Sequence, residues 1–237
     1  MSGFDIGAML VWYLVFVFST TFHEYAHALA AYKGGDLTAY EGGQLSLDPL
    51  PHIRREPFGM VLVPLLSFFQ MGWMIGWASV PYDAEWGRRN PRKHAVMSLA
   101  GPAANLSLAL LALIALRVLL ATGVFEIPEP GQLSFAQMVA LPEGADSRSP
   151  LGAVAMALSI LLNLNVLLGI FNLLPIPPLD GASVLEGAAP RQLGPIYQKL
   201  REIPMMSLLG LIIAWGIFRY IAFPVLSTVL MLLYRPL

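Results

Sequence analysis

Four long apolar stretches dominate the sequence, and they restrict the chain to folds that keep most of its surface away from water. They cover residues 8–31, 95–121, 151–174 and 205–234. Only 12% of the 237 residues are charged, whereas about a quarter are charged in soluble domains. Because about 20 apolar residues span a bilayer, we expect an all-α polytopic membrane protein that forms one domain over residues 1–237.

The residue types also restrict the chemistry. Because there is no cysteine, disulfides and thiolate ligands are excluded, and a transition metal would need His, Asp or Glu. The net charge of −1 argues against nucleic acid as a partner. The first apolar stretch follows no basic segment and is longer than a signal peptide, so we predict a retained span.

Basic residues predict how the spans are oriented, because Lys and Arg accumulate on the cytoplasmic side. Segments 32–57, 81–94 and 176–204 contain ten of the 14 Lys and Arg residues, whereas segment 122–150 is acidic. The first three segments are therefore predicted to lie on the cytoplasmic side.

Two further elements are expected around the spans. The apolar segment 58–80 is interrupted by Pro64, Gln70, Gly72 and Gly76, and the charge pattern requires it to enter and leave on one side. We therefore favour a re-entrant segment, with an ordinary span as the alternative. Short stretches of alternating apolar and polar residues around Gly42 and Gly43 predict a small β-hairpin within 38–47.

The first apolar stretch contains the sequence His23-Glu24-Tyr25-Ala26-His27, an HExxH motif. Residues four apart lie on nearly one face of a helix, about 6 Å apart along its axis, so two imidazoles can bind one cation. The glutamate can then take a proton from zinc-bound water as general base. With a helix ending near Tyr32, His27 would lie about 8 Å from that end, inside the bilayer. The alternative is a polar cluster that holds helices together.

A hydrolytic zinc site needs a third protein ligand. The residues alone leave five candidates open: Asp48, His52, Asp83, His94 and Asp180. An Asp-Gly pair is ordinarily a turn, but Asp180 follows prolines that end a long apolar span. Irregular backbone near a membrane is tolerated where it lines a cavity, which favours Asp180.

Three motifs in this order make the chain resemble the site-2 proteases, a family of intramembrane zinc metalloproteases. They are His23-Glu24-x-x-His27, Ala100-Gly101-Pro102-x-x-Asn105 and Asn172-x-x-Pro175-x-Pro177-x-Leu179-Asp180-Gly181. The segment 47–53 also resembles the compact prokaryotic members, which have no PDZ or CBS domain. It departs from them at Arg54-Arg55-Glu56, where relatives often have an acid and a proline, so we expect His52 to lie in an ordinary loop.

The resemblance implies a fold, a cofactor and roles for individual residues. The fold would be a three-helix catalytic core with additional spans, the re-entrant segment and the small β-hairpin. One Zn²⁺ would be held by His23, His27 and Asp180, with Glu24 as general base. Asn105 and Asn172 would contact the substrate or hold helices together; the remaining Asn163 and Asn165 are expected to join helices.

The implied function is hydrolysis of peptide bonds in or near the transmembrane segments of membrane proteins, in regulated intramembrane proteolysis. The partners would be membrane-spanning substrates and the lipid bilayer. We expect the prokaryotic inner membrane, with the active site nearer the cytoplasmic face. The alternatives are a metal transporter or metal-binding scaffold that does not hydrolyse, and an inactive relative. A transporter should have ligands along a path through the bilayer, whereas an inactive relative would not need the whole set of catalytic residues.

Overall fold

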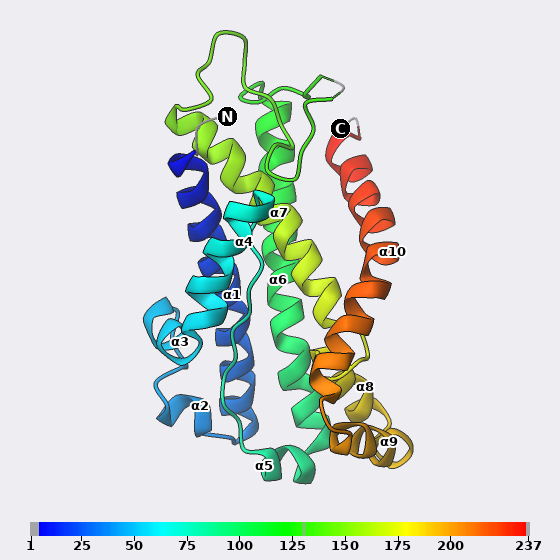
Figure 1. Ribbon diagram of the computed structural model, residues 1–237. Coiled ribbons are helices and arrows are strands. Elements are labelled where there is room, and N and C mark those ends of the chain that lie inside the picture. Colours follow the sequence, from blue (N-terminus) through cyan, green and yellow to red (C-terminus); the bar gives the residue numbers. More distant parts are fainter. Residues whose placement is uncertain (1–4, 130, 236–237) are drawn as a thin grey trace.

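Four long helices form the body of the protein in a computed structural model, which describes residues 5–129 and 131–235. They are α1 (Ile6–Gly34), α6 (Pro91–Ala121), α7 (Pro150–Asn172) and α10 (Met206–Tyr234) (Figure 1). Each is long and apolar enough to cross a membrane. The four predicted spans are therefore confirmed as helices, and residues 206–234 form one continuous helix in spite of Pro224.

Helices α1, α6 and α7 pack against one another and form the core of the molecule (Figure 1). Trp12 and Phe16 of α1 are buried against Ile160 of α7. Further along, Leu116 of α6 is buried with Leu162 of α7. These contacts hold the predicted three-helix core together, because its helices share two apolar clusters.

Local signals explain where these helices begin and end. Asp5 precedes α1 and its carboxylate accepts a hydrogen bond from the amide of Ala8, as an N-cap residue does. Gly35 ends α1 with a φ of 96°, a left-handed conformation that glycine adopts without a steric penalty. Ser149 caps α7, and proline occupies the first turn of both α6 and α7, where no intrahelical amide bond is lost.

The predicted β-hairpin around Gly42 and Gly43 is not found. Thr38–Glu41 instead forms the short helix α2, and the β-bridges of the described chain pair Glu126 with Ala140 and Ser134 with Gln137. The reason is local: Asp36 accepts hydrogen bonds from both the amide and the hydroxyl of Thr38, which favours a helical turn there.

The segment predicted to be re-entrant leaves and returns to the same end of the molecule. It rises as the π-helical turn η1 (Phe58–Leu62) and helix α4 (Val63–Met71), and residues 73–83 then return as extended chain (Figure 1). The amide of Trp77 donates to the carbonyl of Gly59, 3.1 Å away, so the returning chain lies beside the start of the rising one. This is the path expected of a re-entrant segment.

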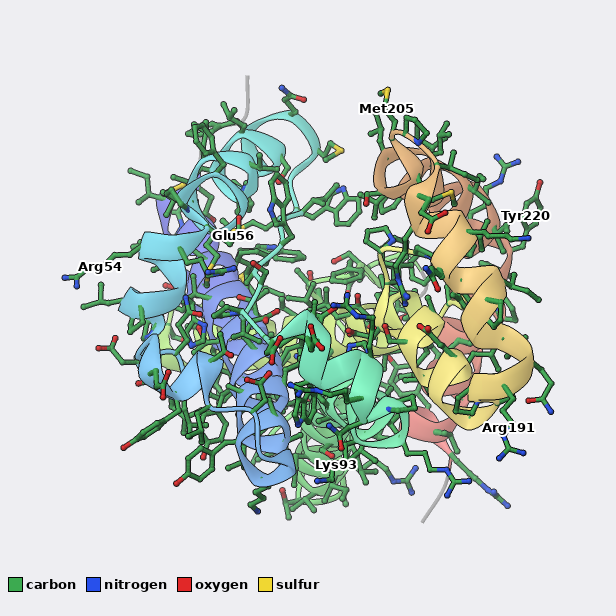
Figure 2. All side chains as sticks on the ribbon, turned by 90° about the horizontal axis from the view of Figure 1, so that it is seen from below. Arg54, Glu56, Lys93, Arg191, Met205 and Tyr220 are labelled. Carbon is green, nitrogen blue, oxygen red and sulfur yellow. The ribbon has the colours of Figure 1, made fainter. Side chains whose placement is uncertain are left out.

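The short helices α3 (Pro49–Arg55), α5 (Ala84–Arg89), α8 (Asp180–Ala188) and α9 (Pro190–Glu202) all belong to the segments that are rich in Lys and Arg. Helices α5, α8 and α9 lie at the end of the molecule where α1 ends (Figure 1). Viewed from this end, Arg54 and Arg191 point outward at the rim (Figure 2), and Lys93 donates to the carbonyl of Gly34 at the end of α1. The other end carries residues 122–129 and 131–149 (Figure 1).

Asp36 joins the end of α1 to α5, and its loss should cost stability. Its side chain is 4% exposed and accepts hydrogen bonds from Thr38 and from the amide of Asp83. Burial raises the pKa of Asp36, but these hydrogen bonds outweigh it and leave the pKa below its ordinary value. A carboxyl with a lowered folded pKa stabilises above its unfolded pKa, and this contribution is lost as pH falls through the folded pKa.

We therefore expect Asp36→Asn to lower the free energy of unfolding by about 2 kcal/mol at pH 7, because an anionic acceptor of hydrogen bonds is removed. The difference from wild type should shrink below about pH 4. Thermal unfolding in detergent at both pH values measures this. Glu85→Gln, which changes an exposed carboxylate paired with Arg88, should have almost no effect. Equal melting temperatures of Asp36→Asn and wild type at pH 7 would contradict the prediction.

Candidate metal centre

The two histidines of the HExxH motif converge from one face of α1. His23 and His27 are one turn apart and are 7% and 5% exposed. Their Nε2 atoms are 2.9 Å apart. The spacing of the motif therefore has the predicted result: two imidazole nitrogens point at one place.

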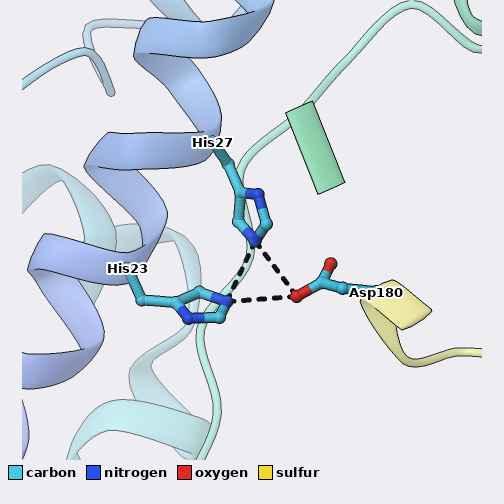
Figure 3. A group of neighbouring side chains, drawn as sticks. All are labelled: His23, His27 and Asp180. Carbon is cyan, nitrogen blue, oxygen red and sulfur yellow. Dashed lines mark hydrogen bonds and ion pairs between the residues drawn. The ribbon is translucent and has the colours of Figure 1, made fainter. Parts of the chain in front are cut away.

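Asp180 completes the cluster from the other side (Figure 3). Its Oδ2 lies 3.3 Å from the Nε2 atoms of both His23 and His27. Helix α7 ends at Asn172, and the chain then crosses to α8, which begins at Asp180. Tyr197 of α9 donates a hydrogen bond to the carbonyl of Pro175 in this crossing, and Leu179 is buried with Ala214 and Phe218 of α10. The proline-rich segment therefore places the carboxylate as predicted.

Asp180 is anionic at neutral pH in this setting. An aspartate is ordinarily ionised at neutral pH, and Oδ2 of this one lies beside two imidazole nitrogens that a cation can bridge. The side chain is thus available as an oxygen ligand.

The Nδ1 atoms of both rings have hydrogen-bond partners that keep the proton on Nδ1 and leave Nε2 unprotonated. The Nδ1 of His27 is 2.7 Å from the carbonyl oxygen of Met97, which can only accept, so this nitrogen donates. The Nδ1 of His23 is 2.5 Å from Oδ1 of Asn105. Both Nε2 atoms then offer lone pairs beside the Asp180 carboxylate. Three such acceptors in one place repel one another unless a cation lies between them, and a divalent metal satisfies all three.

The backbone of α6 leaves room for such an ion. Gly101 packs against the two imidazoles so closely that a Cβ placed on it would lie 2.3 Å from Nε2 of His27 and 2.5 Å from Nε2 of His23. A zinc ion lies about 2.0–2.1 Å from its histidine nitrogens. Because Gly101 has no side chain, the two imidazoles can lie against the backbone of α6 with both Nε2 atoms accessible to an ion, and the donor set of two imidazoles and one carboxylate fits zinc.

The metal cluster opens into a cavity of about 890 Å³. Glu24 and Asn172 both line this cavity beside the cluster. Glu24 is 6% exposed, and among the described residues it has no ion-pair partner. The arrangement leaves its carboxylate available to a molecule in the cavity, as a general base requires.

The other sequence candidates are placed elsewhere or differently. Asn105 is 0% exposed and lies behind His23 rather than on the cavity wall, so its predicted substrate contact has no support here.

Asp48 and Asp83, two of the candidate third ligands, cap α3 and α5. His52 lies in helix α3 and not in the predicted loop; it is buried there, with Nε2 3.0 Å from the carbonyl of Ser46. His94 lines the cavity but is outside the one cluster of possible metal ligands found in the described residues.

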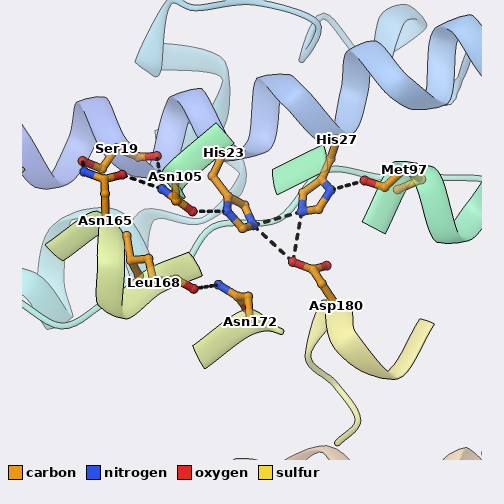
Figure 4. A network of polar contacts seen from close by, with 9 residues as sticks. All are labelled: Ser19, His23, His27, Met97, Asn105, Asn165, Leu168, Asn172 and Asp180. Carbon is orange, nitrogen blue, oxygen red and sulfur yellow. Dashed lines mark hydrogen bonds and ion pairs between the residues drawn. The ribbon is translucent and has the colours of Figure 1, made fainter. Parts of the chain in front are cut away.

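Two buried residues connected to this centre are not singled out as site residues by the sequence. Ser19 and Asn165 are joined to Asn105 by hydrogen bonds (Figure 4). In the sequence, Asn163 and Asn165 lie two positions apart in one apolar stretch, and only the rotation of α7 shows which of them faces the centre.

Comparison with known proteins adds independent findings. Residues 11–215 match the family model described as peptidase family M50. The chain is 34% identical over 178 residues to "Putative zinc metalloprotease YwhC" of Bacillus subtilis, covering 75% of this chain and 68% of that protein. It is 31% identical over 169 residues to "Putative zinc metalloprotease Rip2" of Mycobacterium tuberculosis, covering 71% of this chain and 53% of the relative. No solved structure matches the chain.

These similarities identify the metal. The matching relatives carry the name zinc metalloprotease, and two histidines with one carboxylate are a donor set of catalytic zinc sites. The cofactor is therefore Zn²⁺, and the cluster of His23, His27 and Asp180 is its candidate site.

Proposed function

This chain belongs to peptidase family M50 and is a membrane zinc metalloprotease, and we propose that it cuts membrane proteins in or near their transmembrane segments. The observation that carries this proposal is the position of the candidate centre inside the membrane-spanning part. His27 is seven residues before Gly34, the end of α1, which places it about 10 Å from that end at 1.5 Å per residue. Ionisable groups at such depth are costly and usually functional.

The proposed roles follow from the contacts. His23, His27 and Asp180 hold the zinc, which supplies Lewis-acid chemistry by polarising a carbonyl and making water more acidic. Glu24 accepts the proton from the attacking water and returns it to the leaving amine. Asn172 lines the same cavity, where its side chain binds the peptide backbone next to the cleaved bond.

The cavity suits an extended apolar peptide. Its far wall is formed by Leu211, Ile212 and Trp215 of α10, and its near wall by the extended residues 75–80. Within the described chain, the amides of Ala78 and Ser79 donate no hydrogen bond. Extended backbone with free amides can pair with a second extended chain. A substrate helix that unwinds over a few residues could therefore bind here and expose its carbonyls.

The surroundings also suggest where the reaction takes place. The centre lies toward the end of the molecule that carries α5, α8, α9, Lys93 and the outward-pointing Arg191 (Figure 2). Because basic residues accumulate on the cytoplasmic side, the proposed site is nearer that face of a prokaryotic inner membrane. Its partners would be membrane-spanning substrates of regulated intramembrane proteolysis.

Cleavage by the purified protein tests this function directly. Wild-type protein in liposomes is mixed with a panel of tagged single-span proteins, with and without the chelator 1,10-phenanthroline, and cleavage sites are mapped by mass spectrometry. We expect a cut within or next to a span, its loss on chelation and its return when zinc is added, because the reaction depends on the metal. Cuts confined to soluble segments far from the span would contradict the proposal. Zinc uptake into the liposomes without any cleavage would favour a transporter.

A further inference from the structure

A row of buried polar side chains from three different spans ends at the metal centre (Figure 4). Ser19 comes from α1, Asn105 from α6 and Asn165 from α7, and each of them is 0% exposed. We call these three residues the amide relay. Buried polar groups in a membrane span are costly unless their hydrogen bonds are satisfied. Each polar atom of the amide relay is therefore expected to have a hydrogen-bond partner.

The far end of the amide relay fixes the orientation of Asn165. Its Nδ2 is 2.8 Å from the carbonyl oxygen of Leu161 and 2.8 Å from the hydroxyl oxygen of Ser19. A carbonyl oxygen can only accept, so the amino group of Asn165 must be the one that faces Leu161. The side-chain oxygen of Asn165 then points toward Asn105.

The orientation of the Asn165 amide determines that of the Asn105 amide. Nδ2 of Asn105 donates to Oδ1 of Asn165 over 2.7 Å and lies 3.4 Å from the carbonyl oxygen of Ser19. If the Asn105 amide were reversed, its oxygen would face these two acceptors. Oδ1 of Asn105 is therefore directed at Nδ1 of His23, 2.5 Å away. His23 must then carry its proton on Nδ1, which leaves the lone pair on Nε2, where the other two zinc ligands converge.

We propose that Asn165 and Ser19 are positioning residues that act through Asn105 to fix the tautomer and the orientation of His23 for zinc. The inference rests on the zinc site described above and adds two residues that do not touch it. His27 does not need side chains to orient its ring, because its Nδ1 donates directly to the backbone carbonyl of Met97. Partners of this kind typically change metal affinity 10–100-fold when they are mutated.

The chain offers a matched control for Asn165. Asn163 is on the same helix, is 3% exposed and donates from its Nδ2 to the carbonyl of Phe135. It has no hydrogen bond to the amide relay among the described residues. Asn163→Ala and Asn165→Ala each remove a buried amide from α7, so both should lower thermal stability. Only Asn165→Ala removes the group that orients Asn105.

The test uses two readouts that do not depend on activity. Zinc affinity is measured in detergent by competition with a chromogenic chelator. ¹⁵N NMR of histidine-labelled, metal-free protein reports the tautomer of each ring, and the chain has only four histidines. We expect Asn165→Ala to bind zinc about 10-fold more weakly and to show His23 as a mixture of tautomers. Asn163→Ala should keep wild-type affinity and a single Nδ1-protonated His23.

Equal zinc affinity and equal His23 spectra in the two variants would overturn the proposal, even if both are less stable than wild type. If Asn165→Ala does not fold, Ser19→Ala replaces it. That variant removes one of the two acceptors of the Asn165 amino group and little volume, and we expect a smaller loss of affinity together with the mixed His23 signal. Wild-type behaviour of Ser19→Ala would then count against the amide relay. A protein that binds zinc normally but cleaves nothing would instead contradict the proposed function.

Discussion

Gly101→Ala should abolish zinc binding while leaving the fold in place. The added Cβ would lie 2.3 Å from Nε2 of His27 and 2.5 Å from Nε2 of His23, so both ligand nitrogens would have to move. Neither ring can move away freely, because the Nδ1 atom of each is held by a hydrogen bond to α6. Alanine is also the better helix former by about 1 kcal/mol, so the helix itself does not oppose the change.

We expect metal analysis of purified Gly101→Ala to give less than a tenth of the wild-type zinc, and cleavage to be undetectable, since the reaction depends on the metal. Gly216→Ala is the control: it makes the same change within a long helix, α10, where a Cβ meets no atom within 4 Å. That variant should bind zinc and cleave like wild type. Circular dichroism and thermal unfolding show whether each variant is folded. Stoichiometric zinc in folded Gly101→Ala would mean that the ion lies somewhere other than between the two imidazoles.

The sequence predicts the spans and the convergence of His23, His27 and Asp180 well, because both depend on short-range patterns. The first span, predicted at residues 8–31, is found as Ile6–Gly34: the apolar length predicts the span, and Asp5 and Gly35 set its ends. His23 and His27 converge because a helix turn brings them together. Asp180 could be proposed because the prolines before it end α7 and leave irregular chain near the membrane boundary.

What the sequence does not predict has one local cause and one cause that depends on contacts between distant segments. The hairpin around Gly42 and Gly43 is wrong because Asp36 binds Thr38 and favours a helical turn. Asn163 and Asn165 look alike in the sequence, yet only Asn165 contacts Ser19, which is 146 positions away. Which asparagine faces the metal centre depends on how α7 is rotated against α1 and α6, and apolar stretches with no polar face leave that rotation open.

Glu24→Gln should leave zinc in place and slow cleavage by about 10²–10⁴-fold, the usual contribution of a general acid–base group. The amide has nearly the same shape as the carboxylate but cannot accept the proton. Glu24 lines the cavity without belonging to the cluster of His23, His27 and Asp180, so the metal content should not change. This separates Glu24→Gln from Gly101→Ala, which should lose activity and zinc together.

The measurement is the single-turnover rate for a substrate that wild type cuts, with zinc determined on the same samples. Glu85→Gln makes the same chemical change on exposed α5 and should leave rate and zinc at wild-type values. If Glu24→Gln cuts at the wild-type rate with zinc bound, the proton must go to another group. His94, which also lines the cavity, would be the next to replace. If Glu24→Gln instead loses its zinc, Glu24 supports the metal, and the assignment of base and ligands has to be revised together.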